Sequence, residues 1–194
     1  MNFFLILVGA ALINNYVLTQ FLGMCPFFGV SKRTETAFGM GLSVLFVMII
    51  ATAITFPFYV YVLVPHNMAY LQTIVFILII ASIVQFLEVF MKKVFSGLYS
   101  MLGVYLPLIT TNCAILGVTL INIQDDFTVI GAIVNSVGAG IGFLIAIVLL
   151  AGMREKYDGD LDILIIFRGF PLALFSAGLM SIAFMGFQGL VIGR

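Results

Sequence analysis

Charged residues divide the chain into long apolar stretches. Five runs contain no Asp, Glu, Lys or Arg: residues 1–31, 36–87, 94–124, 127–153 and 169–193. A helix that crosses a membrane needs about 20 apolar residues, so each run is long enough for one crossing. The run 36–87 is long enough for two, with Pro65-His66-Asn67 as the turn between them.

The pattern therefore predicts an all-α fold with six membrane-spanning helices in a single membrane domain, residues 1–194. The predicted spans lie near Asn2–Met24, Ala37–Val64, Tyr70–Met91, Leu98–Ile123, Val129–Met153 and Ile166–Ile192. Aliphatic runs such as Val75–Ile83 and Ile141–Leu150 are also typical of buried strands, but their continuation over helix length favours helices.

Composition agrees with a protein whose solvent is lipid. Of the 194 residues, 63% are hydrophobic and only 8% are charged, whereas a soluble domain carries about 25% charged residues. A soluble enzyme and a disordered segment are thereby excluded, and the net charge of zero argues against a nucleic-acid binder. Because residues 1–31 hold no basic n-region, a cleaved signal peptide is not expected.

The basic residues predict the orientation in the membrane. Seven of the eight Lys and Arg fall in the loops after spans 1, 3 and 5 or at the start of span 6: Lys32, Arg33, Lys92, Lys93, Arg154, Lys156 and Arg168. The other side holds Arg194 and the pair Asp125-Asp126. Because basic residues favour the cytoplasmic side, we expect a cell inner-membrane protein with both termini outside.

A short internal repeat contains the two cysteines. Cys25 to Ser31 and Cys113 to Thr119 both read C-x-x-x-G-V-[ST], and a glycine pair follows each in the next span, at Gly39 and Gly41 and at Gly138 and Gly140. An odd number of crossings separates the two copies, so the second copy is inverted. The chain is therefore predicted to hold two inverted three-helix repeats, about 1–93 and 94–194, an arrangement that places sites near the bilayer midplane.

Polar residues and prolines predict that spans 1 and 4 are broken near the cysteines. Around Cys25 these residues are Asn14, Asn15, Gln20, Gly23 and Pro26, and before Cys113 they are Pro107, Thr110, Thr111 and Asn112. Proline removes a helical hydrogen bond, and Thr, Asn and Gln side chains can satisfy the backbone groups that it frees. The alternative is that these polar side chains only bind neighbouring helices together.

The cysteines themselves are candidate metal ligands. Thiolates favour iron–sulfur clusters, zinc or copper(I), but an iron–sulfur cluster usually takes four cysteine ligands and this chain has two. A cluster at Cys25 and Cys113 would therefore be shared with a second, similar subunit. The alternative is that each thiol is a small buried hydrophobic group.

Three groups of motifs identify a family. The first two are Asn14-Asn15-Tyr16-Val17-Leu18 and Phe21-Leu22-Gly23-Met24-Cys25-Pro26-Phe27-Phe28-Gly29-Val30-Ser31-Lys32, and the third is Leu106-Pro107-Leu108-Ile109-Thr110-Thr111-Asn112-Cys113-Ala114-Ile115-Leu116-Gly117. They closely resemble the A subunit of Rnf-type electron-transport complexes. The likeness continues through Val84 to Glu88, Arg154 to Lys156 and Ala177 to Gly186, and the E subunit of sodium-pumping NADH:quinone reductase is a near neighbour.

The resemblance implies a function. In that family, six-helix A and E subunits form an inverted pair and jointly hold an iron centre, generally taken as a [2Fe–2S] cluster, in the middle of the membrane. Its ligand positions correspond here to Cys25 and Cys113, with Gly23, Pro26, Thr111 and Asn112 expected to support them; backbone amides near Gly23 and Asn112 are expected to bind sulfur. The complex couples electron transfer between ferredoxin and NAD⁺ to Na⁺ or H⁺ translocation, and no flavin is expected on this chain.

Two other functions stay open on the sequence. A secondary transporter of a small solute also has inverted repeats and broken helices, and it would work without its cysteines. A purely structural assembly protein would depend on packing glycines such as Gly140 rather than on thiols. The coupling ion, the cluster type and the direction of electron flow are not encoded in any motif of this chain.

Overall fold

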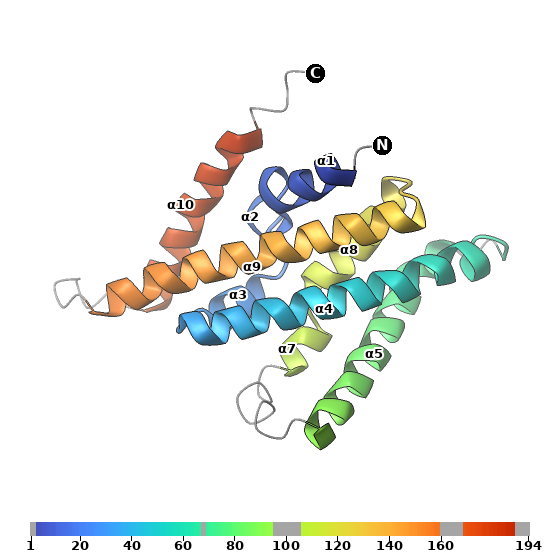
Figure 1. Cartoon of the computed structure of the whole chain (residues 1–194), viewed down its shortest axis with the longest axis horizontal. Coiled ribbons are helices and arrows are strands. Elements are labelled where there is room, and N and C mark those ends of the chain that lie inside the picture. Colours follow the sequence, from blue (N-terminus) through green and yellow to red (C-terminus); the bar gives the residue numbers. More distant parts are fainter. Residues whose placement is uncertain (1–2, 67–68, 95–105, 160–168, 189–194) are drawn as a thin grey trace.

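The computed structural model describes residues 3–66, 69–94, 106–159 and 169–188, and every regular element in them is a helix (Figure 1). The elements are α1 (Phe3–Val8), the π-helix η1 (Gly9–Ile13), α2 (Tyr16–Thr19), α3 (Met24–Val30), α4 (Thr34–Phe58), the π-helix η2 (Tyr59–Leu63), the 3₁₀-helix η3 (Ala69–Leu71), α5 (Gln72–Val94), α7 (Leu106–Thr110), α8 (Cys113–Gln124), α9 (Val129–Gly159) and α10 (Phe170–Gln188). The predicted all-α class is thereby confirmed for these residues.

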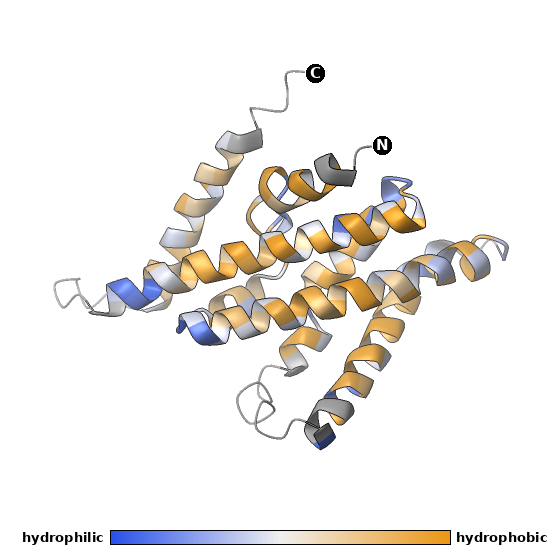
Figure 2. Ribbon diagram, viewed as in Figure 1, coloured by the Kyte–Doolittle hydropathy of each residue, from blue (hydrophilic) through white to orange (hydrophobic). Residues whose placement is uncertain are grey.

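Among the described residues, three helices are long and apolar enough to cross a membrane. They cover Thr34–Leu63, Gln72–Val89 and Val129–Tyr157, close to the predicted spans 2, 3 and 5. Shorter apolar helices cover Leu108–Gln124 and Phe170–Gly186, and Figure 2 shows how apolar residues dominate the ribbons. The predicted spans 4 and 6 include residues 98–105, 166–168 and 189–192, which lie outside the described residues.

The centre of the molecule is an antiparallel pair, α4 and α9 (Figure 1). Each helix places a glycine against a leucine of the other. A Cβ on Gly41 would lie 3.2 Å from the Cα of Leu144, and a Cβ on Gly140 would lie 3.1 Å from the Cα of Leu45. These two contacts are reciprocal, since in each helix the leucine follows the glycine by four residues, so it lies one turn further on the same face.

The predicted first span is not one helix. After α1 the backbone widens into η1, stops at Asn14 and Asn15, forms the single turn α2, and stops again at residues 20–23 before α3 begins. The second stop contains two residues in the left-handed region, Phe21 at φ 57° and Gly23 at φ 82°. No α-helix continues through such residues, so the interruption that the sequence predicts in the span Asn2–Met24 is present in the described residues of that span.

The prolines do not cause these breaks. Pro26 is the third residue of α3 and Pro107 lies within α7, where the helix continues to Thr110. A proline in the first turn of a helix removes no internal hydrogen bond, because the first N–H groups have no partner there. The sequence-based expectation that proline frees backbone groups at the cysteines was therefore wrong for Pro26.

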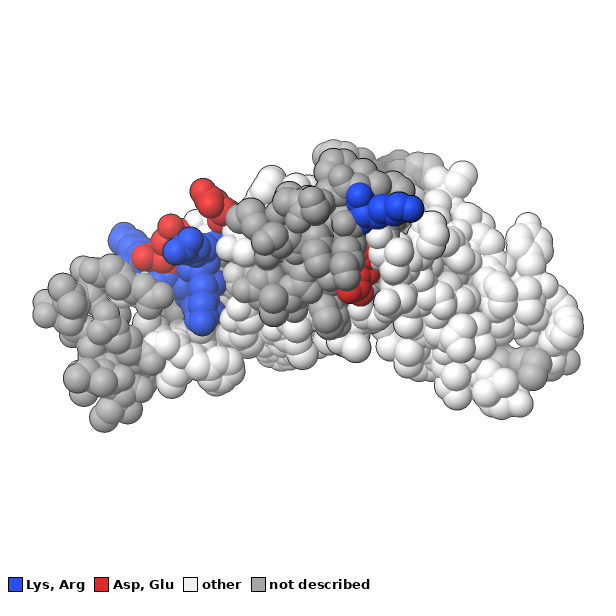
Figure 3. Space-filling view, turned by 90° about the horizontal axis from the view of Figure 1, so that it is seen from below, with Lys and Arg blue, Asp and Glu red and all other residues white. Residues whose placement is uncertain are grey.

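Four of the basic residues expected in loops lie in helices instead. Lys92 and Lys93 are in the last turn of α5, and Arg154 and Lys156 are in the last two turns of α9. Basic residues are favourable there because the C-terminal end of a helix is the negative end of its dipole. Figure 3 shows a group of Lys and Arg, together with Asp and Glu, where α4 begins and α9 ends, and further Lys or Arg apart from this group.

A buried polar network lies between four helices. The side chain of Asn135 donates to Asn122 (2.7 Å) and to the hydroxyl of Tyr16 (3.3 Å). Asn122 donates to Ser136 (3.1 Å), whose hydroxyl lies 2.7 Å from that of Thr52. All five side chains are buried, so the network joins α2, α8, α9 and α4 through groups that would be costly to leave unpaired.

Candidate functional site: two cysteines at interrupted helices

The first cysteine lies just after the interruption at residues 20–23. Cys25 is the second residue of α3, and its thiol is free and exposed. Met24, Phe28 and Gly29 of the same helix line a shallow cavity of about 430 Å³ with Cys25 and with Phe170 of α10. The thiol is therefore presented at the surface of the chain rather than packed in its core.

The second cysteine is built in a similar way. The chain stops being helical at Thr111 and Asn112, and Cys113 is the first residue of α8. The side-chain oxygen of Asn112 accepts a hydrogen bond from the backbone N–H of Ala114 (3.0 Å), which caps the new helix. Cys113 is also free and exposed.

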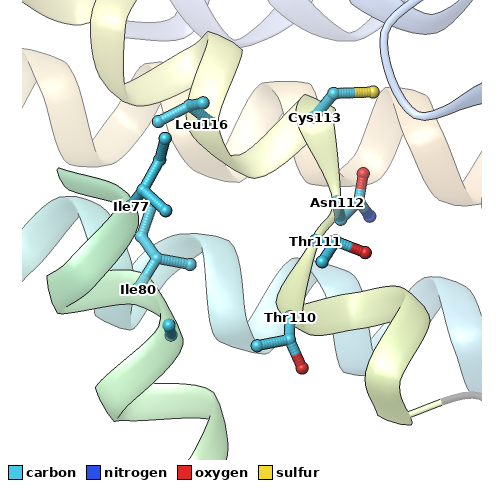
Figure 4. Close-up of a pocket in the computed structure, with 8 residues that line it drawn as sticks. Ile77, Ile80, Thr110, Thr111, Asn112, Cys113 and Leu116 are labelled. Atoms are coloured by element: carbon cyan, nitrogen blue, oxygen red, sulfur yellow. The ribbon is translucent and has the colours of Figure 1, made fainter. Parts of the chain in front are cut away.

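A second cavity, of about 310 Å³, lies beside this interruption. It is lined by residues 110–113, by Leu116, and by Ile77, Ile80 and Ala81 of α5. Figure 4 shows the Cys113 sulfur and the Thr111 and Asn112 side chains projecting to one side of the break, with Ile77, Ile80 and Leu116 on the other side. The polar and sulfur-bearing groups are thus separated from an apolar wall.

The two interruptions meet in space. The backbone N–H of Gly23 donates a hydrogen bond to Sγ of Cys113, with an N···S distance of 2.9 Å. Since consecutive Cα atoms are about 3.8 Å apart, this sulfur lies no more than about 12 Å from the Cα of Cys25. The two segments that carry the cysteines are therefore in contact, through residues 90 positions apart in the sequence.

Glycine is required at the point of contact. Gly23 is buried and has a left-handed backbone, and a Cβ there would lie 3.0 Å from Ala114 and 3.0 Å from Phe143. Leu22 packs equally closely on α8, since a Cβ on Gly117 would lie 2.6 Å from its Cδ1. The loop thus lies directly on the start of α8, with its amide directed at the thiol.

Backbone N–H groups lie near both cysteines. Cys25 and Cys113 both occupy the first turn of a helix, where backbone N–H groups are unpaired and the helix dipole is positive. Gly23 adds a further N–H donor at Cys113. No group of three or more His, Cys, Asp or Glu lies close enough to hold a metal ion within the described part of the chain.

The other predicted supporting residues divide into two kinds. Asn112 is 4% exposed and adjoins the thiol, and Thr111 lines the same cavity. Pro26 is buried in the first turn of α3, where it fixes the start of the helix and offers no hydrogen-bond donor. The ligand roles of Cys25 and Cys113 stay predictions.

One contact was not found from the sequence. Nη1 of Arg154 in α9 donates to the carbonyl of Phe28 (3.0 Å) and to the hydroxyl of Ser31 (2.8 Å). It satisfies the C-terminal end of α3, the helix that begins next to Cys25. In the sequence Arg154 contributes to the predicted orientation and to the family likeness, but no spacing signal links it to a helix so much earlier.

Fold and site together define an α-helical membrane protein whose two thiols are presented at interrupted helices. The family model described as "Rnf-Nqr subunit, membrane protein" matches residues 3–191. The chain is 54% identical over 193 residues to the A subunit of the Na(+)-translocating ferredoxin:NAD(+) oxidoreductase complex of Acetobacterium woodii, with 100% of both chains covered. It is 50% identical to the A subunits of the ion-translocating oxidoreductase complexes of Syntrophotalea carbinolica (99% of each chain) and Aeromonas hydrophila (98% of each). The chain belongs to the Rnf–Nqr family of membrane subunits.

Proposed function

We propose that this chain is the A-type membrane subunit of an Rnf-type complex, in which electron transfer between ferredoxin and NAD⁺ drives the translocation of Na⁺ or H⁺. The family match over residues 3–191 and the names of relatives that align over the full chain support this assignment. The chain is an electron relay within the complex and is not catalytic alone.

The relay centre is an iron–sulfur cluster, of the [2Fe–2S] type, held by Cys25 and Cys113. The observation that carries this proposal is the hydrogen bond from Gly23 to the Cys113 sulfur, because it brings the two cysteine-bearing segments together. A cluster usually takes four cysteine ligands. A homologous E-type subunit supplies the remaining ligands, and both thiols are exposed on this chain, as a shared site requires.

The donor set suits such a group. When bound, the cluster supplies one-electron transfer across a low-dielectric layer. The protein contributes two thiolates, the positive ends of α3 and α8, the Gly23 N–H and the side-chain amide of Asn112. Hydrogen bonds to sulfur are one of the means by which a protein sets the potential of a cluster.

The inverted repeat is part of this proposal. Residues of repeats 1 and 2 contact each other through equivalent pairs, Gly41 with Leu144 and Gly140 with Leu45, which supports two halves related by a two-fold axis. The basic residues gathered where α4 begins and α9 ends (Figure 3) support a cytoplasmic location for that end, with both chain termini on the outside.

Substitution of either cysteine tests the function. In the purified complex, Cys25→Ser or Cys113→Ser should leave the chain inserted and assembled, but it should abolish one cluster signal in electron paramagnetic resonance together with ferredoxin-dependent NAD⁺ reduction. Met24→Leu is the matched control, because it removes a thioether next to Cys25 and conserves volume. A wild-type signal in either serine variant refutes the cluster assignment.

A secondary transporter is the second candidate. The cavity of about 310 Å³ beside the break at Thr111 and Asn112 favours it, because interrupted helices form solute sites in transporters. The same variants separate the two functions. A transporter keeps its activity when both cysteines are replaced, and its purified form is colourless and free of iron.

A further inference from the structure

Asn15 and Asn112 cap helices in the same way in the two halves of the chain. The side-chain oxygen of Asn15 accepts a hydrogen bond from the N–H of Val17 (3.1 Å) at the start of α2. The side-chain oxygen of Asn112 accepts from the N–H of Ala114 (3.0 Å) at the start of α8. Both side chains are almost completely buried, at 1% and 4% exposed.

The two side chains differ in their amide nitrogens. Nδ2 of Asn15 donates to the carbonyl of Gly142 (2.9 Å). Both polar atoms of this side chain therefore have hydrogen-bond partners within the chain. Nδ2 of Asn112 is buried and has no hydrogen-bond partner among the described residues. A buried donor without an acceptor costs about 1–3 kcal/mol, and such groups are rare in native proteins.

The cap determines where this donor lies. Because Oδ1 of Asn112 is engaged by the Ala114 N–H, the oxygen and nitrogen of the amide cannot be exchanged without losing the cap. The amide therefore carries its free N–H groups beside residue 113. In Figure 4 the Asn112 amide and the Cys113 sulfur project to the same side of the break.

We infer that the side-chain amide of Asn112 donates a hydrogen bond to an anionic sulfur atom of the group held at Cys113. This inference rests on the proposed function and adds a role for one residue to it. A hydrogen bond to sulfur stabilises the reduced, more negative state of a cluster, so Asn112 raises the reduction potential of the relay. The backbone N–H of Gly23 also donates a hydrogen bond to Cys113.

Asn112→Ser in the purified complex tests the inference. Serine is as good a helix cap as asparagine, so α8 should still begin at Cys113, while the amide donor is lost. We expect an unchanged iron content, a midpoint potential shifted to a more negative value, and altered g-values in the paramagnetic resonance spectrum of this cluster. A potential and spectrum identical to those of the wild type overturn the inference.

Asn15→Ser is the matched control. It keeps the cap of α2 and removes the hydrogen bond to Gly142, so we expect lower thermal stability and an unchanged cluster potential. An equal shift of potential in both variants would mean that Asn112 acts only through packing, which also overturns the inference.

Two further measurements test the role of Asn112 if its variant does not assemble, and separate that role from the proposed function. If Asn112→Ser does not assemble, pulsed paramagnetic resonance of wild-type complex labelled with ¹⁵N in the asparagine side-chain amide should show a ¹⁵N coupling to this cluster, and no coupling overturns the inference. Cys113→Ser separates this result from the proposed function. If Cys113→Ser removes the cluster while Asn112→Ser changes nothing, only the role of Asn112 is wrong.

Discussion

The backbone amide of Gly23 donates a hydrogen bond to the sulfur of Cys113 over 2.9 Å, across 90 residues of sequence. This contact joins the loop before the first cysteine to the helix that begins with the second. Its geometry depends on a left-handed backbone at residue 23 and on the absence of a side chain there.

Gly23→Ala should therefore lower the stability of the fold and disturb the contact between residue 23 and Cys113. A left-handed alanine costs about 1–2 kcal/mol, and its Cβ would be forced against Ala114 and Phe143 at 3.0 Å, which adds about 1–3 kcal/mol. We expect a lower thermal unfolding midpoint of the purified complex and a weakened cluster signal. Gly152→Ala is the control, since a Cβ there meets nothing within 4 Å in α9; equal stability of the two variants would disprove the requirement for glycine.

The crossing of α4 and α9 gives a second prediction. Gly41→Ala and Gly140→Ala each place a Cβ 3.1–3.2 Å from backbone of the other helix, so each should destabilise the protein by about 1–3 kcal/mol. Gly39→Ala lies in the same helix as Gly41 with open space around it, and it should be neutral or stabilising because alanine favours helix. Thermal unfolding in detergent compares the stabilities of the three variants. If the Gly39 variant is as unstable as the Gly41 variant, the close contact at Gly41 does not explain the loss of stability.

The buried network is sensitive at Asn135. Asn135→Ala removes the donor to Asn122 and to Tyr16, and it leaves the Asn122 oxygen buried without that partner at a cost of about 1–3 kcal/mol. The expected result is a lower unfolding midpoint with an unchanged cluster spectrum. Ser82→Ala removes an exposed hydroxyl that only bonds its own helix, and its effect should stay within about 0.5 kcal/mol.

Arg154 is predicted to hold the end of the Cys25 helix. Arg154→Gln loses the charge-assisted hydrogen bonds to Phe28 and Ser31, each typically worth about 1.5–3 kcal/mol and less at a partly exposed site. Hydrogen exchange should rise in residues 24–31. Lys32→Gln changes an exposed charge next to the same helix and should leave this exchange unchanged. Protection equal to wild type in the Arg154 variant would mean that α3 does not need the contact.

The sequence was sufficient for the long helices but not for the interrupted ones. Continuous apolar runs determine α4, α5 and α9, since a lipid solvent leaves few alternatives to a helix. The stops before Cys25 depend on Phe21 and Gly23 adopting left-handed conformations against α8, which local pattern does not encode. The prolines correctly indicated that the helices are interrupted near the cysteines. The predicted cause was wrong for Pro26, which lies in the first turn of α3 rather than at the end of a helix.

The sequence singles out the residues of the candidate site but does not predict how they are arranged. Cys25 and Cys113 were found because they are the only thiols and occupy equivalent repeat positions. The contact between the two segments that carry them depends on Gly23. The difference between Asn15 and Asn112 depends on whether a carbonyl of α9 lies nearby. Both are tertiary relationships between segments distant in the chain, so no spacing rule could supply them.

Iron and acid-labile sulfide in the isolated pair of this chain and its proposed E-type partner test the proposed shared cluster most directly. We predict iron and sulfide bound in equal amounts in the wild-type pair, and neither in pairs that carry Cys25→Ser or Cys113→Ser. Undiminished iron and sulfide in a pair that lacks both cysteines would contradict the account.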